Sequence, residues 1–428
     1  MKIYNNPNRK DWAKILARPT FESVSLEEKV SGILKDIQTF GDIAIKRFTK
    51  QFDKVVLENS KVEQAEIAAA IANVPAELKS AIQQAKSNIE AFHLAQKESV
   101  QEIETMPGVK CWRKSVGIDK VGLYIPGGTA PLFSTILMLG VPAKIAGCKE
   151  IILCTPPSKD GTVNPAILYA AHLVGVTKIF KIGGVQAIGA MAYGTETVPK
   201  VYKIFGPGNQ YVTAAKQAVQ RDGLAIDMPA GPSEVMVVAD GSANPAFVAA
   251  DLLSQAEHGP DSQVVLVATN KEVVEGIQTE LSKQLAALPR RAFAAKALEN
   301  SCTIINDDVF DVVDIINEYA PEHLILAIEA AEGVANDITN AGSVFIGHYS
   351  PESVGDYASG TNHTLPTNGF ARAYSGVSLD SFCKKITFQQ LSKQGLKNIG
   401  KTVELMANAE ELVAHARAVS IRLATFDD

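Results

Sequence analysis

The sequence has few of the residues that most often mark a metal site or a disulfide framework. Only seven histidines occur in 428 residues, and the five cysteines are widely spaced, with no CxxC pair among them. An odd number of scattered cysteines argues against a disulfide framework and indicates free thiols in a reducing compartment. Five of the seven histidines follow residue 257, so their positions are more informative than their number.

Long apolar runs and an excess of one charge are also missing. The N-terminus lacks the apolar core of a secretory signal, and polar residues and proline interrupt the most apolar stretch, residues 130–147. The net charge of −6 comes from interspersed residues of both signs, without a basic run. We therefore expect a cytoplasmic protein with no membrane span and with neither nucleic acid nor membrane as a partner.

The pattern from residue 116 onward predicts an α/β protein. Short β-rich runs alternate with Ala- and Leu-rich helical patterns, which is typical of βαβ units in parallel, doubly wound sheets. Residues 26–100 and 387–425 have helical patterns instead. The expected strands form two successive series: 121–128, 151–157, 178–184 and 201–209, then 234–240, 263–270, 302–307, 323–328 and 343–347.

The two series predict two Rossmann-like domains with a cleft between them. Ligands usually bind in such clefts and at the carboxyl ends of parallel strands. An apolar stripe on the last helix, with Leu412 and Val419, needs the protein body or another subunit to cover it. The expected parts are an N-terminal arm over 1–20, a first α/β domain from 21–120 plus 233–375, a second over 121–232, and a helical tail over 376–428.

Two pairs of polar residues in the second series are candidates for chemistry. Gln255 and His258 share one face of a helix end, where they could hold a metal or ligand or, for His258, simply cap the helix. Glu322 and His323 precede an apolar strand. An adjacent carboxylate and imidazole can transfer protons, although such a dipeptide is commonly a surface feature.

A polar stretch and the last helix add further candidates. Long polar loops in compact enzymes are most often functional or disordered, and Asp356 and His363 are the strongest ligand candidates within residues 352–372. His415 lies on the apolar side of the last helix, where a histidine is normally a core residue. Ser233 ends a Pro-rich turn that is equally consistent with a crossover between domains.

Nucleotide binding has a weak signal. GPGN at 206–209 lies between an expected strand and helix, where main-chain N–H groups can bind a phosphate. The GPGN segment continues into neither GxGxxG nor GxxxxGK[ST], since Gln210 and Tyr211 follow Asn209. Motifs alone therefore leave NAD binding open.

Several segments in one order resemble the histidinol dehydrogenase family. They are IDMPAGPSE (226–234), SQAEHGPDSQ (254–263), YAPEHL (319–324), GDYASGTNH (355–363) and EELVAHA (410–416). The resemblance covers the chain from residue 121 onward and implies two successive NAD-linked oxidations, from L-histidinol through the aldehyde to L-histidine. It also implies a homodimer in which the helical tail packs on the partner subunit.

The same resemblance implies roles for individual residues. One Zn²⁺ per subunit would be held by Gln255, His258, Asp356 and His415, with His415 coming from the partner. His323 would accept the alcohol proton, and Glu322 would activate the water that adds to the aldehyde. The implied substrate contacts are Ser233, Gln255, His258, His323, Asp356, His363, Glu410 and His415. The implied NAD contacts are Tyr124, Gln186 and Asn209.

Two other functions stay open at this point. A zinc dehydrogenase could act on a different small polar alcohol, although His363 and Glu410 suit an imidazole and an amine. A catalytically silent zinc or amino-acid binding protein is the alternative outside enzymes. Such a binder has no need for both Glu322 and His323.

Overall fold

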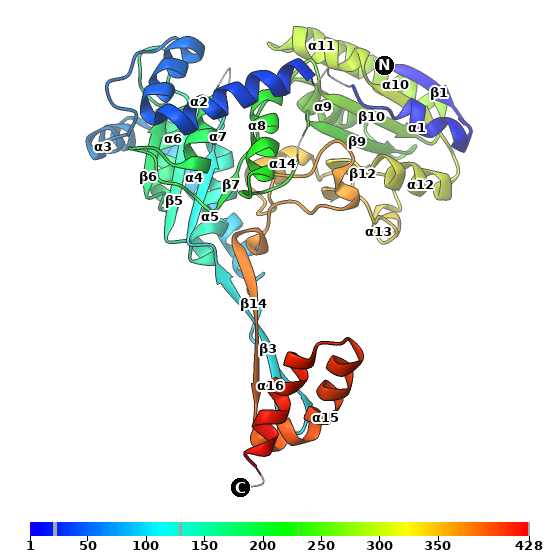
Figure 1. Ribbon diagram of the computed structural model, residues 1–428. Helices are drawn as coiled ribbons and strands as arrows, with labels where there is room; N and C mark the ends of the chain where they lie inside the picture. Colours follow the sequence, from blue (N-terminus) through cyan, green and yellow to red (C-terminus); the bar gives the residue numbers. More distant parts are fainter. Residues whose placement is uncertain (20–23, 128–130, 230, 427–428) are drawn as a thin grey trace. The chain divides into compact units, whose positions relative to one another are not determined.

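The computed structural model describes residues 1–19, 24–127, 131–229 and 231–426 (Figure 1). The described chain divides into two units. Unit 1 contains residues 1–95 and 118–382, and unit 2 contains residues 96–117 and 383–428. Unit 1 holds two parallel sheets, called sheet A and sheet B below, and unit 2 holds an antiparallel sheet.

Sheet A is parallel throughout. Its central strands are buried along their whole length, which is typical of a parallel sheet covered by helices on both faces. Val235 and Val237 face a core with α9 to α11, whereas Met236 and Val238 face a core with α1, α12 and α13. The strands in spatial order are β1 (Lys2–Asn5), β11 (Cys302–Ile305), β10 (Gln263–Ala268), β9 (Glu234–Ala239), β12 (His323–Ala327) and β13 (Ser343–Ile346). The helices are α1 (Trp12–Ile15), α9 (Pro245–Ala256), α10 (Lys271–Ala287), α11 (Arg291–Glu299), α12 (Val309–Tyr319) and α13 (Ala331–Ala335).

Sheet B has the same plan with five parallel strands. Val121 and Leu123 contribute to a core with α4 to α6, and Tyr124 contributes to the opposite core with α2, α7 and α8. The strands in spatial order are β6 (Lys178–Lys181), β5 (Glu150–Thr155), β4 (Lys120–Tyr124), β7 (Lys203–Phe205) and β8 (Ala225–Ile226). The helices are α2 (Val24–Phe48), α4 (Ala76–Leu94), α5 (Phe133–Ala146), α6 (Pro165–Val174), α7 (Gly184–Tyr193) and α8 (Gln210–Arg221). Both predicted strand series are therefore confirmed, and the fold is α/β.

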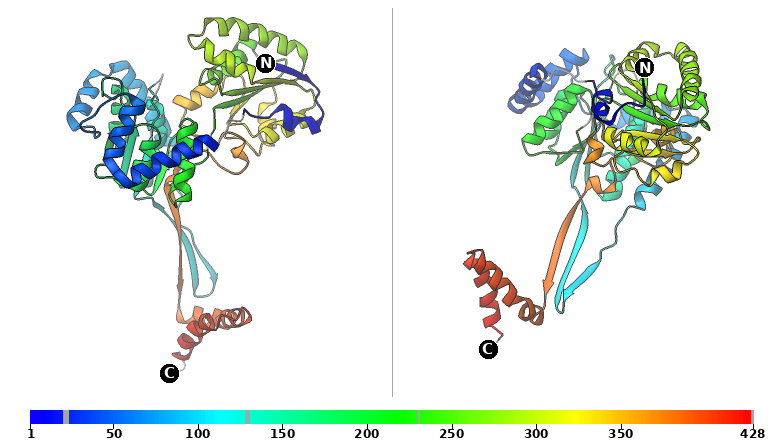
Figure 2. Two further views of the ribbon diagram at one scale, coloured as in Figure 1. Left: turned by 45° about the horizontal axis from the view of Figure 1, so that its top comes forward. Right: turned by 90° about the vertical axis from the view of Figure 1, so that its right-hand side faces the viewer.

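The N-terminal fifth of the chain packs differently from the expected domain plan. The expected arm contributes β1, which lies at one edge of sheet A (Figures 1 and 2) and pairs in parallel with β11. Trp12 is buried in a core of sheet A. Helix α2 packs on α7 and α8, α4 packs on α5, and α3 (Gln64–Asn73) packs on α6. The helices expected beside sheet A thus cover sheet B. Helical periodicity identifies an apolar face but does not say which sheet it covers. The expected boundary at residues 20 and 21 lies outside the described residues.

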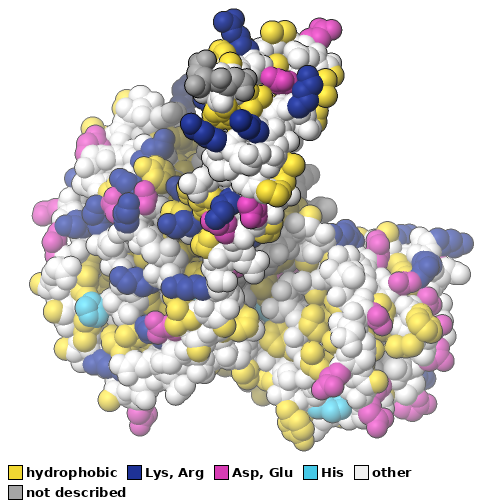
Figure 3. Space-filling model, turned by 90° about the horizontal axis from the view of Figure 1, so that it is seen from below, with side chains coloured by type: hydrophobic (Ala, Val, Ile, Leu, Met, Phe, Trp, Pro, Cys, Tyr) yellow, Lys and Arg dark blue, Asp and Glu magenta, His cyan; other side chains and the backbone are white. Residues whose placement is uncertain are grey.

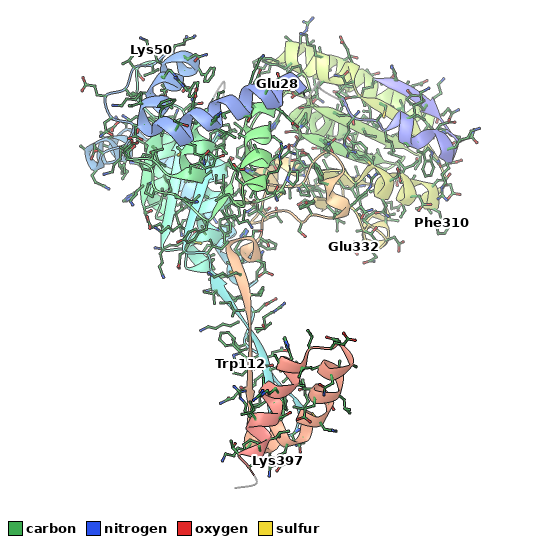
Figure 4. The ribbon with its side chains drawn as sticks, viewed as in Figure 1. Glu28, Lys50, Trp112, Phe310, Glu332 and Lys397 are labelled. Atoms are coloured by element: carbon green, nitrogen blue, oxygen red, sulfur yellow. The ribbon has the colours of Figure 1, made fainter. Side chains whose placement is uncertain are left out.

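Unit 2 contains a strand where the sequence pattern predicts a helix. β14 (Cys383–Leu391) pairs antiparallel with β3 (Val109–Gly117), which also pairs with β2 (Glu102–Met106). Trp112, labelled in Figure 4, stacks on Phe388 across the β3–β14 pair at 5.4 Å. The helical prediction for residues 387–391 is therefore wrong. Pairing with β3, which a local pattern does not show, makes this segment a strand. The tail continues as α15 (Lys393–Ala409) and α16 (Val413–Ala424), which confirms its helical part.

The surface agrees with the mixed charge of the sequence. Side chains of both signs are interspersed on the face shown in Figure 3. Among the described residues, no helix combines the length and apolar character needed to cross a membrane.

Candidate active site

Glu322 and His323 lie at the amino end of β12, and both are buried. The neighbouring strand β9 begins at Glu234, whose main chain bonds to both side chains. The Glu234 N–H donates to Oε2 of Glu322 at 2.8 Å, and the Glu234 carbonyl lies 3.1 Å from Nδ1 of His323. Because a carbonyl oxygen only accepts, Nδ1 carries the hydrogen. One residue of β9 therefore orients both members of the pair.

This location differs from the expected one. Ligands in open α/β sheets usually bind outside the carboxyl ends of the strands, but Glu322, His323 and Glu234 lie at the amino edge of sheet A. The parallel register places His323 opposite Val235. Adjacent parallel strands share their amino edge, so the residues that start β9 and β12 meet there.

Burial and neighbouring charge shape the electrostatics of the pair. Burial raises the pKa of Glu322 above its usual value, although the nearby His323 opposes this shift. Burial alone would lower the pKa of His323. The charge of Glu322 and the hydrogen bond to Asp356 outweigh burial, and the pKa of His323 is well above its usual value. Both pKa values are therefore raised, and the buried pair favours holding a proton between Glu322 and His323 over leaving a buried carboxylate charge alone.

Asp356 and His363 from the polar loop complete this part of the cluster. Asp356 lies on α14 (Glu352–Tyr357), and its Oδ1 is 3.1 Å from Nε2 of His323. Its main-chain carbonyl accepts a hydrogen bond of 2.8 Å from Nδ1 of His363. The second ring nitrogen of His363 lies 3.0 Å from Oγ1 of Thr135 on α5. The loop residues singled out from the sequence therefore join β12 and α5 at one site.

Gln255 and His258 lie at the end of α9. The helix ends at Ala256, so His258 occupies the following turn, where its N–H donates to the Gln255 carbonyl at 3.2 Å. Its Nδ1 is 3.5 Å from Oγ of Ser233. Burial lowers the pKa of His258, and charges on Asp356, His323 and His363 also act on this pKa. His258 therefore belongs to the same cluster.

The side-chain amide of Gln255 provides a test of metal binding. Gln255 is 1% exposed, and its buried Nε2 and Oε1 have no hydrogen-bond partner among the described residues. An orphaned buried amide is costly, so a ligand that uses its oxygen fits this position. Within the described residues, no group of three or more His, Cys, Asp or Glu side chains is arranged to hold a metal ion. A ligand set that includes a glutamine is of a different kind.

Glu410 and His415 belong to unit 2, whereas the residues of the cluster just described belong to unit 1. Glu410 follows α15 as its C-terminal cap, and His415 lies in the first turn of α16. Both are exposed. The interpretation of His415 as a core residue is therefore wrong. The expected ligand set divides into Gln255, His258 and Asp356 in unit 1 and His415 in unit 2.

The three residues expected to contact NAD line one cavity of about 1170 Å³ in unit 1. Tyr124 ends β4, Gln186 lies on α7, and Asn209 caps α8. The cavity lies at the carboxyl ends of β4 and β5, and β4 is where the strand order of sheet B reverses. This is the usual ligand position in doubly wound sheets.

The GPGN segment differs in detail from its expected role. Its Asn209 side chain accepts hydrogen bonds from the N–H groups of Tyr211 and Val212 at 3.0 and 3.2 Å. Those two donors are satisfied within the chain. A phosphate at this helix start would therefore meet fewer free N–H groups than the sequence pattern suggests.

Asp53 is a cavity residue that no sequence motif indicates. It lines the same cavity and accepts a hydrogen bond of 3.3 Å from Nε2 of Gln186. Burial raises its pKa to about 6, and the Gln186 bond only partly opposes this. Asp53 ends a short helical turn without any recognisable pattern around it. Its place in this cavity is therefore known only from the tertiary structure, through the cavity lining and the contact with Gln186.

Comparison with known proteins gives a consistent result. The family model described as histidinol dehydrogenase matches residues 16–423. A histidinol dehydrogenase of Bacteroides thetaiotaomicron is 60% identical over 425 residues, covering 99% of both chains. A chloroplastic histidinol dehydrogenase of Arabidopsis thaliana is 53% identical over 410 residues, covering 95% of this chain and 88% of the relative. A crystal structure of histidinol dehydrogenase from Elizabethkingia anophelis matches with a TM-score of 0.98 at 57% identity, covering 100% of this chain and 99% of the other.

Proposed function

Because this chain belongs to the histidinol dehydrogenase family, we propose that it oxidises L-histidinol through L-histidinal to L-histidine, the end of histidine biosynthesis. The observation that carries the proposal is the buried Glu322–His323 pair, which the main chain of Glu234 orients. Bound NAD would supply the hydride acceptor for each oxidation. The first oxidation needs a base directed at substrate, and the second needs a base directed at water.

His323 is the base for the alcohol. Its Nδ1–H is engaged with the Glu234 carbonyl, so Nε2 is the nitrogen that exchanges the proton, and it can accept one from the alcohol only when its hydrogen bond to Asp356 is broken. Glu322 is the base for the second oxidation, in which a water adds to the aldehyde carbon and loses its proton to the carboxylate. Burial of Glu322 raises its pKa, which brings this carboxylate closer to the range where a general base works at neutral pH.

Gln255, His258 and Asp356, together with His415, are the residues proposed to hold Zn²⁺. Their nitrogen and oxygen donors suit this metal, and the unpartnered amide of Gln255 supports the assignment. When bound, Zn²⁺ would supply a Lewis acid that orients the nitrogen donors of the substrate. The residues proposed to contact the substrate are these four together with Ser233, His323, His363 and Glu410.

Tyr124, Gln186 and Asn209 are proposed to contact NAD. Their shared cavity of about 1170 Å³ supports this assignment, since it is large enough for an extended cofactor. We also propose the cytoplasm as the compartment of the enzyme, because five widely spaced cysteines without a CxxC pair do not suit a disulfide framework.

We further propose a homodimer with shared sites, and the place of the proposed ligand His415 in unit 2 supports it. Leu405, Met406, Leu412 and Val413 are exposed on the helices of unit 2, which supports a partner subunit as their cover. Mixing His415→Ala chains with His258→Ala chains tests this, because mixed dimers would regain one complete site. Absence of activity in verified mixed dimers would place the whole site in one chain.

The stoichiometry of NADH formation tests the activity itself. The purified protein with zinc is expected to form two NADH for each L-histidinol consumed, and a chelator should abolish turnover. Turnover of another small alcohol with none of histidinol would change the substrate assignment. Stoichiometric zinc or histidinol binding without any NADH would favour a binding protein.

A further inference from the structure

Arg18 makes a buried ion pair with Glu234. Its Nε donates to Oε1 of Glu234 at 2.6 Å and its Nη2 donates to Oε2 at 2.9 Å. The two side chains are 14% and 3% exposed. This two-point geometry joins residues 216 positions apart in the chain, and it is the arrangement in which arginine binds a carboxylate most strongly.

Arg18 is held in place from the other side as well. Its Nη2 donates to the carbonyl of Tyr319 at 2.7 Å, and its guanidinium lies 4.1 Å from the centre of the Tyr319 ring. Tyr319 is the last residue of α12, just before the Pro321-Glu322-His323 segment. The guanidinium therefore connects the start of β9 with the turn that leads into β12.

Glu234 is at the centre of this network. Its carboxylate also accepts the N–H of Asn368 at 2.8 Å. Its own N–H and carbonyl bond to Glu322 and His323. A buried carboxylate without its cation would be expelled toward water or would draw in a proton, and either change would move the main chain that carries it.

We propose that Arg18 is a positioning residue for both bases, acting through Glu234. The inference rests on the proposed function, in which Glu322 and His323 serve the two oxidations. Arg18 touches neither base and lies outside every segment that carries the family resemblance. Its effect passes through two hydrogen bonds from one peptide segment, so loss of Arg18 should impair both oxidations together. A purely structural ion pair would lower stability without this common kinetic effect.

The kinetic test compares Arg18→Ala, Arg18→Lys and the control Arg9→Ala. Arg9 comes from the same N-terminal stretch and also pairs with a carboxylate, Asp314, and an aromatic ring, Trp12, but it is exposed. Arg18→Ala should lower kcat by about 10- to 100-fold with histidinol and with histidinal alike, because small displacements of reacting groups cost this much. The KM for NAD should stay unchanged. Arg18→Lys should recover only part of the loss, since an ammonium cannot bind both oxygens in the same way.

Added guanidinium chloride gives a second kinetic readout. At millimolar concentration it should partly restore Arg18→Ala and leave Arg9→Ala unaffected. Unchanged kcat in Arg18→Ala, despite a lower melting temperature, would overturn the proposal. A loss confined to one of the two oxidations would overturn it too.

A spectroscopic readout keeps the proposal separate from the proposed activity. In protein with ¹⁵N-labelled histidine, the Nδ1–H signal of His323, assigned with His323→Ala, should shift and exchange faster with water in Arg18→Lys and Arg18→Ala. An unchanged signal would overturn the positioning role even if wild-type protein failed to oxidise histidinol. Failure of histidinol turnover with the expected change in this signal would instead overturn only the proposed function.

Discussion

Nε2 of His323 and Oδ1 of Asp356 are 3.1 Å apart, so a proposed base and a proposed metal ligand share one hydrogen bond. Replacing Asp356 would therefore disturb both roles at once, and its kinetic effect could not be assigned to either. Gln255 allows a cleaner test of metal binding, because its buried amide has no hydrogen-bond partner in the part of the chain that the structure describes.

We expect Gln255→Ala to lose bound zinc and to change the stability of the metal-free protein only slightly. The substitution removes a proposed donor without breaking a hydrogen bond within the chain. Zinc content by mass spectrometry and the free energy of unfolding of the metal-free protein provide the two measurements.

Gln263 is the matched control for Gln255. It is 3% exposed, and its amide bonds to the carbonyls of Ala17 and Asn300 and to the Tyr319 hydroxyl. Gln263→Ala should cost about 1–3 kcal/mol through the groups left unpaired, while zinc is retained. Full zinc occupancy in Gln255→Ala would contradict the proposed ligand set.

Glu322→Gln and His323→Ala are expected to fail at different oxidations. Glu322→Gln should reduce histidinal oxidation by roughly 100-fold or more and histidinol oxidation less, because only the second step deprotonates water. His323→Ala should chiefly reduce histidinol oxidation. Steady-state rates with each substrate supplied separately distinguish the two. Equal losses on both substrates in both variants would show that the roles are not divided in this way.

Gly206 is expected to tolerate no side chain. Its φ is +127°, and a Cβ would lie 2.0 Å from the carbonyl oxygen of Tyr124. The loop cannot easily shift, because the Gly206 N–H donates to Asp227 at 2.8 Å and its carbonyl accepts from Lys216 at 2.9 Å. Gly206→Ala should therefore destabilise the protein and raise the KM for NAD through Tyr124 and Asn209.

Gly223 is a control that distinguishes the free-energy cost of a positive φ from that of the steric clash expected at Gly206. Its φ is +94°, but a Cβ there would meet nothing within 4 Å. Gly223→Ala should cost about 1–2 kcal/mol, the usual cost of this conformation, with an unchanged KM for NAD. Equal free energies of unfolding for the two variants would show that the contact with Tyr124 is relieved at little cost.

The stability of the Asp53→Asn variant should increase relative to that of the wild type as the pH rises. Burial raises the pKa of Asp53 from 3.8 to about 6, so the folded protein holds this proton more tightly than the unfolded chain does. The contribution of Asp53 to stability is therefore largest below about pH 4 and is lost as the pH rises through about 6. Asparagine does not titrate. The difference in melting temperature, variant minus wild type, should increase between pH 4 and pH 7, and a constant difference would contradict the pKa shift.

Periodicity and motif order predicted much of the fold and part of the site. The strands around Val121 and Val235 are apolar and bounded by turn residues, so their period is visible locally. Gln255 stood out at a helix end, Glu322 and His323 just before an apolar strand, and Asp356 within a long polar stretch. β14 was missed, since its identity as a strand depends on pairing with β3, which precedes it by more than 260 residues.

Local chemistry in the sequence was therefore enough to determine the α/β class and the two strand series, and it marked candidate residues for metal binding and proton transfer. The tertiary structure alone decided which residues hold them: Glu234 between the two bases, Arg18 behind Glu234, and Asp53 beside Gln186. Periodicity reports only which face of an element is apolar. Hydrogen bonds across hundreds of residues depend on how the elements pack, and no local pattern records that packing.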